Sequence, residues 1–154
     1  MATEGKSLKA RAADLLSRRE YSRRELERRL APFAESAEQL AETLDELAGA
    51  NWQSDSRFAQ QFADSKGGKF GSRRLAQEMR QRGVDDDTIR DALQDQDDLA
   101  SARLQWRKKF GKLPDSPQEK ARQYRFLAAR GFPGDVIRQV LAGGADDDDS
   151  FFED

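Results

Sequence analysis

Apolar residues recur at every third or fourth position along most of the chain, which is the spacing of one face of an α-helix. Leu26, Leu30 and Phe33 form one such series, and Ile89 and Leu93 form another. Sustained alternation of apolar and polar residues, which would indicate strands, is missing from the sequence. The pattern predicts an all-α fold with nine short helices, at residues 8–19, 22–32, 36–49, 54–66, 71–82, 85–93, 96–111, 116–130 and 133–142.

Short sequence signals mark several helix ends. Ser22–Glu25, Ser36–Gln39 and Ser116–Glu119 match the capping box, in which a serine and a Glu or Gln three residues later bond each other's backbone N–H groups. Gly83 and Gly131 stand where two predicted helices end, and glycine readily adopts the left-handed backbone conformation common at such positions. We expect capping boxes at the three serines and left-handed turns at the two glycines.

The chain contains internal repeats. RGVDDDTIRDAL at residues 82–93 matches RGFPGDVIRQVL at residues 130–141, an offset of 48 residues. At an offset of 49 residues, Tyr21 aligns with Phe70. We therefore predict three tandem three-helix repeats, at residues 1–53, 54–95 and 96–143, followed by an acidic disordered tail at residues 144–154. Since one repeat encloses little apolar volume, neighbouring repeats must bury surface against each other. We expect an elongated, curved, solenoid-like stack.

The composition argues against an enzyme. The 154 residues include no cysteine and no histidine, so the chain has no thiolate nucleophile and lacks the commonest general base and transition-metal ligand. Mean hydropathy is -0.94, and no window approaches the roughly 20 apolar residues that span a bilayer. We expect a non-enzymatic, monomeric, cytoplasmic protein that binds no cofactor, no metal ion and no membrane.

Basic residues gather at equivalent places in the three repeats, although the formal net charge is -2. Each cluster spans the end of one predicted helix and the start of the next. In a regular stack these places lie on one side, so the clusters would form a continuous basic face. A row of arginines, each able to bridge two phosphate oxygens, would bind nucleic acid. The candidate binding residues are Arg18, Arg19, Arg23, Arg24 and Arg28 in the first repeat, Lys66, Lys69, Arg73, Arg74 and Arg80 in the second, and Lys108, Lys109, Lys112, Arg122 and Arg125 in the third.

The basic clusters also have a simpler explanation. Arginines on highly charged helices usually pair with carboxylates at i,i+3 or i,i+4 spacing, and Glu20, Glu25 and Glu27 are available in the first repeat. This explanation is the better one for any single arginine. The recurrence of the clusters in three repeats favours binding.

Aromatic side chains near the basic clusters could stack on bases, but the helical spacing assigns most of them to the core. Phe70 is the least certain, because it lies in the loop KGGKFGS among lysines. Since Tyr21 takes the equivalent place in the first repeat, we expect Phe70 to have a structural role in the turn.

Three stretches of the chain carry a family resemblance. They are LLSRREYSRRELERRL at residues 15–30, SDSRFAQQFADSKGGKFGSRRLAQEMRQRGV at residues 54–84 and EKARQYRFLAARGF at residues 119–132. In this order and at this spacing they resemble the RecX family, the bacterial regulators of the RecA recombinase, from about Leu8 to Leu141. The positions that match the family's motifs are Arg18, Arg19, Ser22, Glu25, Leu26, Arg57, Phe58, Gly71, Arg74, Leu75, Gly83, Arg130 and Gly131.

The resemblance implies three tandem three-helix repeats and also a function. RecX proteins bind the helical filament that RecA forms on single-stranded DNA, suppress its ATP hydrolysis, strand exchange and co-protease activity, and favour its disassembly. A member would modulate recombinational DNA repair and the SOS response without catalysis of its own. We expect the RecA filament and single-stranded DNA as partners, and double-stranded DNA stays open as a third. A general nucleic-acid-binding protein that competes for DNA and a scaffold for another protein remain alternatives.

The chain departs from the family pattern at two places. Gln53-Ser54-Asp55 stands where the family often has Leu-Asp-Asp, and Lys69–Ser72 stands where the family usually has Gly-x-Gly-Pro. The missing proline removes a rigid helix start. We therefore expect a looser loop before the helix at residues 71–82.

Overall fold

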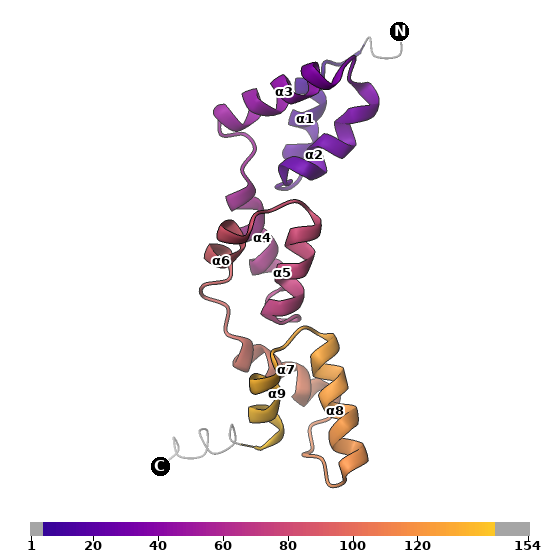
Figure 1. Ribbon diagram of the computed structural model, residues 1–154, viewed down its shortest axis with the longest axis vertical. Helices are drawn as coiled ribbons and strands as arrows, with labels where there is room; N and C mark the ends of the chain where they lie inside the picture. Colours follow the sequence, from indigo (N-terminus) through magenta and orange to yellow (C-terminus); the bar gives the residue numbers. More distant parts are fainter. Residues whose placement is uncertain (1–4, 144–154) are drawn as a thin grey trace. The chain divides into compact units, whose positions relative to one another are not determined.

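The computed structural model describes residues 5–143, and all regular structure in this range is helical (Figure 1). The predicted all-α fold is therefore confirmed, while the predicted tail at residues 144–154 lies outside the described residues. No helix in the described range is long and apolar enough to cross a membrane. The α-helices are α1 (Leu8–Leu16), α2 (Arg23–Leu30), α3 (Ala37–Gly49), α4 (Asp55–Lys66), α5 (Ser72–Gln81), α6 (Asp86–Ala92), α7 (Asp98–Lys109), α8 (Pro117–Ala129) and α9 (Gly134–Leu141), and a short 3-10 helix, η1 (Ala31–Phe33), follows α2.

The first helix is shorter than the predicted range of 8–19. It ends at Leu16 because the Ser17 hydroxyl donates to the carbonyl of Asp14 over 2.7 Å and the Arg18 N–H donates to the carbonyl of Leu15 over 3.0 Å. These bonds tighten the last turn and close off the helix.

Only one of the three predicted capping boxes is complete. At Ser22 both halves are present, because the Ser22 hydroxyl accepts from the Glu25 N–H and the Glu25 carboxylate accepts from the Ser22 N–H. Ser36 and Ser116 cap their helices, but the predicted return bond, in which Gln39 or Glu119 accepts the N–H of the capping serine, is wrong in both cases. Gln39 accepts instead from the N–H of Glu35, and the Glu119 carboxylate binds side chains of its own helix.

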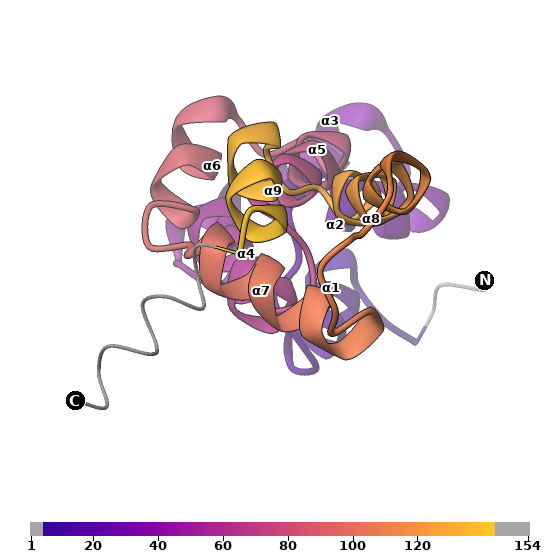
Figure 2. The same cartoon turned by 90° about the horizontal axis from the view of Figure 1, so that it is seen from below.

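The described residues form two compact units. Those up to Gln61 form the first unit together with Met79–Ala92, and Phe62–Glu78 form the second unit together with the described residues from Leu93 onward. In the second unit α9 packs against both α7 and α8 (Figure 2). The first core contains Leu8, Ala12, Tyr21, Leu26, Leu30, Leu40, Leu44 and Leu47, and the second contains Ala102, Trp106, Leu127, Phe132, Ile137, Val140 and Leu141. The division passes through α4 and α5, and the three repeat boundaries and the curved stack stay predictions.

In the first unit, the start of α2 lies against the end of α5. The Ser22 hydroxyl donates to the carbonyl of Arg82 over 2.7 Å, and the Arg82 guanidinium lies 3.4 Å from the Glu25 carboxylate. Gly83 has a φ of 86°, which confirms the predicted left-handed turn. A Cβ atom on Gly83 would come within 2.8 Å of the Arg24 Cβ atom, so this close approach also requires glycine.

In the second unit, the start of α5 meets the end of α8, here through backbone N–H groups. The Gly71 N–H donates to the carbonyl of Arg130 over 2.8 Å, and the Arg73 N–H donates to the carbonyl of Gly131 over 3.1 Å. Gly131 has a φ of 92°, again as predicted. A Cβ atom on Gly131 would overlap the Arg74 side chain and lie 2.6 Å from the Arg74 backbone nitrogen.

This geometry predicts that Gly131→Ala lowers the free energy of unfolding by more than about 1 kcal/mol, because alanine meets both a left-handed backbone and the α5 backbone. Urea unfolding followed by far-UV circular dichroism measures the effect. Gly68→Ala is the matched control, since a Cβ atom there has no neighbour within 4 Å. Equal unfolding midpoints for the two variants would show that the helix-end contact is not tight in solution.

Candidate nucleic-acid interface

The basic clusters lie around the three connections between the first and second helices of the predicted repeats. We call these connections corners: residues 17–22, 67–71 and 110–116. The structure fixes each corner by a buried or partly buried glutamine, and these glutamines therefore determine where the neighbouring cations lie.

Gln53 fixes the first corner. Its side-chain amide donates to the carbonyl of Tyr21 over 3.3 Å and to the Asp55 carboxylate over 3.0 Å. The same Asp55 oxygen accepts the N–H of Arg23, the first residue of α2, over 2.8 Å. Gln53 is 4% exposed, so its polar groups depend on these partners. Gln53 and Asp55 thus hold the end of the corner where it enters α2.

Gln96 fixes the second corner through equivalent atoms. Its amide donates to the carbonyl of Phe70 over 3.3 Å and to the Asp98 carboxylate over 3.3 Å. Asp98 accepts the N–H of Ser72 over 2.9 Å and its hydroxyl over 2.5 Å. We expected this loop to be looser because the family's proline is missing. It is instead held by the Ser72 N–H, a donor that proline lacks. We call these two sets of bonds clamps. In both, a glutamine and an aspartate stand two positions apart in the sequence, as Gln-x-Asp, and we predicted nothing from this spacing.

In the third corner, the glutamine comes from the second helix of the same repeat. The Gln123 amide donates to the carbonyl of Lys112 over 3.1 Å and to the Glu119 carboxylate over 2.9 Å. Its side-chain oxygen accepts the indole N–H of Trp106 over 2.8 Å. Gln123 is 1% exposed and fully hydrogen-bonded, so the corner is internally fixed.

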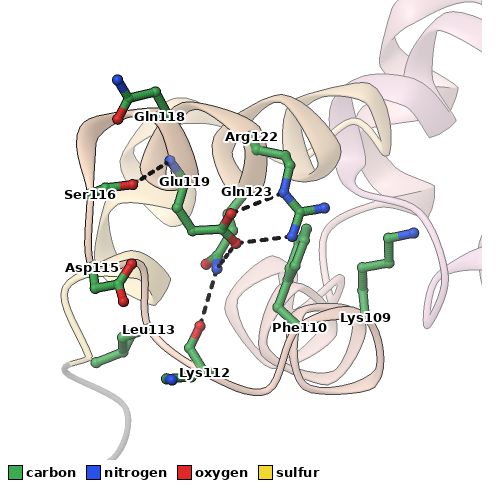
Figure 3. Close-up of a pocket in the computed structure, with 10 residues that line it drawn as sticks. All are labelled: Lys109, Phe110, Lys112, Leu113, Asp115, Ser116, Gln118, Glu119, Arg122 and Gln123. Carbon is green, nitrogen blue, oxygen red and sulfur yellow. Dashed lines mark hydrogen bonds and ion pairs between the residues drawn. The ribbon is translucent and has the colours of Figure 1, made fainter.

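A pocket of about 500 Å³ opens beside this third corner (Figure 3). The Arg122 guanidinium donates two hydrogen bonds of 3.0 Å to the Glu119 carboxylate at its edge. These bonds, followed by the bond from Gln123, lower the pKa of the Glu119 carboxyl, and Glu119 raises the pKa of Arg122. The pocket is lined by Lys109, Phe110, Lys112, Leu113, Asp115, Ser116, Gln118, Glu119, Arg122 and Gln123. Within residues 5–143 no group of three metal-ligating side chains occurs.

Five of the fifteen candidate binding residues are engaged in ion pairs. Arg19 lies 3.2 Å from the Glu25 carboxylate, and Arg23 lies 2.8 Å from that of Asp45. The other three are Arg74 with Glu78, Arg80 with Asp86 and Arg122 with Glu119. Only Arg74–Glu78 and Arg122–Glu119 have the i,i+4 or i,i+3 spacing of the simpler explanation, while the carboxylate partners of the other three arginines lie six or more residues away.

Seven other candidates make no hydrogen bond or ion pair between their side chain and a described residue. They are Arg18, Arg24, Arg28, Arg73, Lys108, Lys112 and Arg125. The remaining three, Lys66, Lys69 and Lys109, lie over aromatic rings. All three clusters thus present cations that can accept an anionic partner.

The structure brings together only part of each predicted cluster. Arg80 belongs to the first unit, whereas Lys66, Lys69, Arg73 and Arg74 belong to the second, where the cations of the third cluster also lie. One continuous basic face across the whole chain stays a prediction.

Two family models match the sequence. Residues 54–93 match the model described as "RecX, second three-helix domain", and residues 95–141 match the model described as "RecX, third three-helix domain".

Curated relatives match nearly the whole chain. "Regulatory protein RecX" of Chromobacterium violaceum is 79% identical over 154 residues, which is 100% of both chains. The protein of the same name from Neisseria meningitidis serogroup B is 47% identical over 143 residues, covering 92% of this chain and 94% of its own. That of Ralstonia pickettii is 42% identical over 139 residues, covering 89% and 87%.

Two solved structures share the fold. RecX from Lactobacillus salivarius has a TM-score of 0.76 at 18% identity and covers 88% of this chain and 92% of its own. A second crystal structure, of a regulatory protein RecX, has a TM-score of 0.73 at 19% identity and covers 86% and 70%.

The Arg122–Glu119 pair predicts a specific titration. The pKa of Glu119 is lowered in the folded chain, so any stabilisation by the pair is present above the ordinary glutamate pKa and is lost as the pH falls through the lowered value. Arg122→Gln removes the main cause and should move the Glu119 midpoint upward in an NMR titration of the side-chain carboxyl. Arg125→Gln, on the same helix, should leave it unchanged. Equal midpoints in the wild type and Arg122→Gln would mean that the pair is not formed in solution.

Proposed function

Because the chain belongs to the RecX family of regulatory proteins, we propose that it regulates the RecA recombinase by binding the filament that RecA forms on single-stranded DNA. Binding inhibits the filament's ATP hydrolysis, strand exchange and co-protease activity, and so modulates recombinational repair and the SOS response. The chain acts as a monomer in the cytoplasm and performs no catalysis.

The observation that carries this function, beside the family, is the set of seven cations without ion-pair partners in the described residues. Cations left unpaired at all three corners suit a polyanion. DNA phosphates or an acidic surface of RecA would supply the missing charge.

The clamps at the corners give this binding a mechanical consequence. Each cluster is attached to a corner whose backbone is fixed by a glutamine amide. Fixed corners spaced along the chain would contact successive RecA subunits and hinder the motions or subunit additions that sustain ATP turnover.

A second candidate function is general binding of nucleic acid, which would inhibit RecA by competition for DNA. The same unpaired cations support it, since contact with phosphates requires no recombinase. The two functions differ in stoichiometry, because a competitor must cover the DNA lattice.

The decisive measurement is a titration of the chain into RecA already assembled on single-stranded DNA, with ATP hydrolysis as the readout. We expect inhibition at far fewer copies than RecA subunits, and we expect it to survive an excess of free single strand. The same titration against DNA without RecA gives the affinity for DNA alone.

Inhibition that needs saturation of the lattice and disappears with competitor DNA would favour the second function. No inhibition under any condition would contradict both functions.

A further inference from the structure

Each helix-end contact places a left-handed glycine against the start of a second helix, but the charged side chains around the two contacts differ. In the first contact, Glu25 is the third residue of α2, and its carboxylate lies 3.2 Å from the Arg19 guanidinium and 3.4 Å from that of Arg82. In the second contact, Arg74 is the third residue of α5, and Arg130 takes the place of Arg82 before the left-handed glycine. A carboxylate between two arginines has been replaced by a further arginine.

These arginines gather on one aromatic ring. The guanidinium carbons of Arg74 and Arg130 lie 4.1 Å and 5.6 Å from the centre of the Phe70 ring, and the Lys69 ammonium lies 5.5 Å from it. Arg130 also lies 5.0 Å from the ring centre of Phe126. Three cations and two partly buried rings of the second unit therefore form a series of contacts, which we call the aromatic–basic row, and Phe126 also packs against the second core.

The row continues to the pocket at the third corner. The rings of Phe126 and Phe110 meet edge to face at 5.4 Å, and the Lys109 ammonium lies 5.6 Å from the Phe126 ring centre. Arg122 lies 4.9 Å from the ring centre of Phe110, and Lys109, Phe110 and Arg122 all line the pocket. Cations and rings thus alternate from the second corner to a cavity of about 500 Å³.

Stability alone does not account for this arrangement. Like charges around one ring repel each other, and among the described residues only Arg74 of the cations on Phe70 has a carboxylate partner, Glu78 at 2.9 Å. One terminal nitrogen of Arg130, Nη1, is buried and has no hydrogen-bond acceptor within residues 5–143. The ring of Phe70 also stays partly exposed, whereas Tyr21 at the equivalent position is 5% exposed. The predicted structural role of Phe70 therefore explains only part of its surroundings.

We propose that the aromatic–basic row binds single-stranded nucleic acid, with bases stacked on Phe70, Phe126 and Phe110 or on the guanidinium planes above them. A phosphate between Arg74 and Arg130 would supply the charge that Glu25 supplies in the first contact. Aromatic rings and arginine planes stack on any base, and only a single strand presents its base faces. This inference rests on the proposed function and names the ligand that the second unit contacts within the filament.

Arg74→Glu tests the charge part of the proposal. The variant places a carboxylate near Arg130, as in the first contact, but it also loses the ion pair with Glu78, so the urea midpoint is measured to verify that the variant is folded under the conditions of the binding assay. Affinity for an oligo-dT strand, measured by fluorescence anisotropy, should fall by about tenfold or more. Arg90→Glu is the matched control, because it makes the same charge change on α6 of the first unit and should keep the affinity within about twofold.

An abasic strand of the same length tests the stacking part. It keeps the phosphates and lacks the bases, so the wild type should bind it about tenfold more weakly than oligo-dT. Phe70→Leu should lose affinity for oligo-dT but not for the abasic strand, and its salt dependence should match that of the wild type because no phosphate contact is lost. Equal wild-type affinities for the two strands would overturn the proposal, as would unchanged binding by Arg74→Glu.

The RecA ATPase titration separates this proposal from the function on which it rests. Inhibition of RecA by a wild-type chain that binds both strands equally would leave the function standing without the stacking site. Preference for the normal strand without any inhibition would leave the site standing without the function.

Discussion

The end of α5 contacts the start of α2, and the end of α8 contacts the start of α5. The rest of the structure depends on these two helix-end contacts. The last carbonyls of an α-helix have no partner inside the helix, and an unmet buried carbonyl costs roughly 1–3 kcal/mol. Here Arg82 and Arg130 offer such carbonyls, which accept from Ser22 and from the N–H of Gly71. The chain can approach this closely only because a glycine with positive φ follows each arginine. The same approach fixes the starts of α2 and α5, from which much of the first two basic clusters projects.

Because a left-handed glycine permits the close approach in both contacts, the side chains around the two contacts can differ in charge. Glu25 completes a capping box and balances two arginines in the first contact. Arg74 at the equivalent position cannot do either, and the second contact is held instead by the backbone N–H groups of Gly71 and Arg73. The second contact thus lacks the carboxylate that lies between two arginines in the first, and an anionic partner would supply that charge there.

Local patterns predicted most of the fold, because helix period, serine caps and helix-ending glycines depend on residues within about one turn. The clamps were missed since Gln53 and Gln96 find their partners 32 and 26 residues away, and a lone glutamine carries no local signal for such a bond. The capping boxes at Ser36 and Ser116 failed where nearby groups competed for the second side chain, as Arg122 does for Glu119. The basic clusters were visible in the sequence. Which cations form ion pairs depends on carboxylates that the fold brings close, so the sequence alone could not separate the paired cations from the unpaired ones.

The third corner differs from the other two in a way that follows from the same bonds. In the second corner Asp98 of the next repeat accepts the N–H of the first α5 residue. The first residue of α8 is Pro117, which has no N–H, so this corner has no need of a following helix start. Gln123 aligns with the buried Leu75 of the second repeat, and a buried amide is stable there only because Trp106 and the Lys112 carbonyl satisfy it. The corner is thus held from within its own repeat, and the aromatic–basic row ends at the pocket beside it.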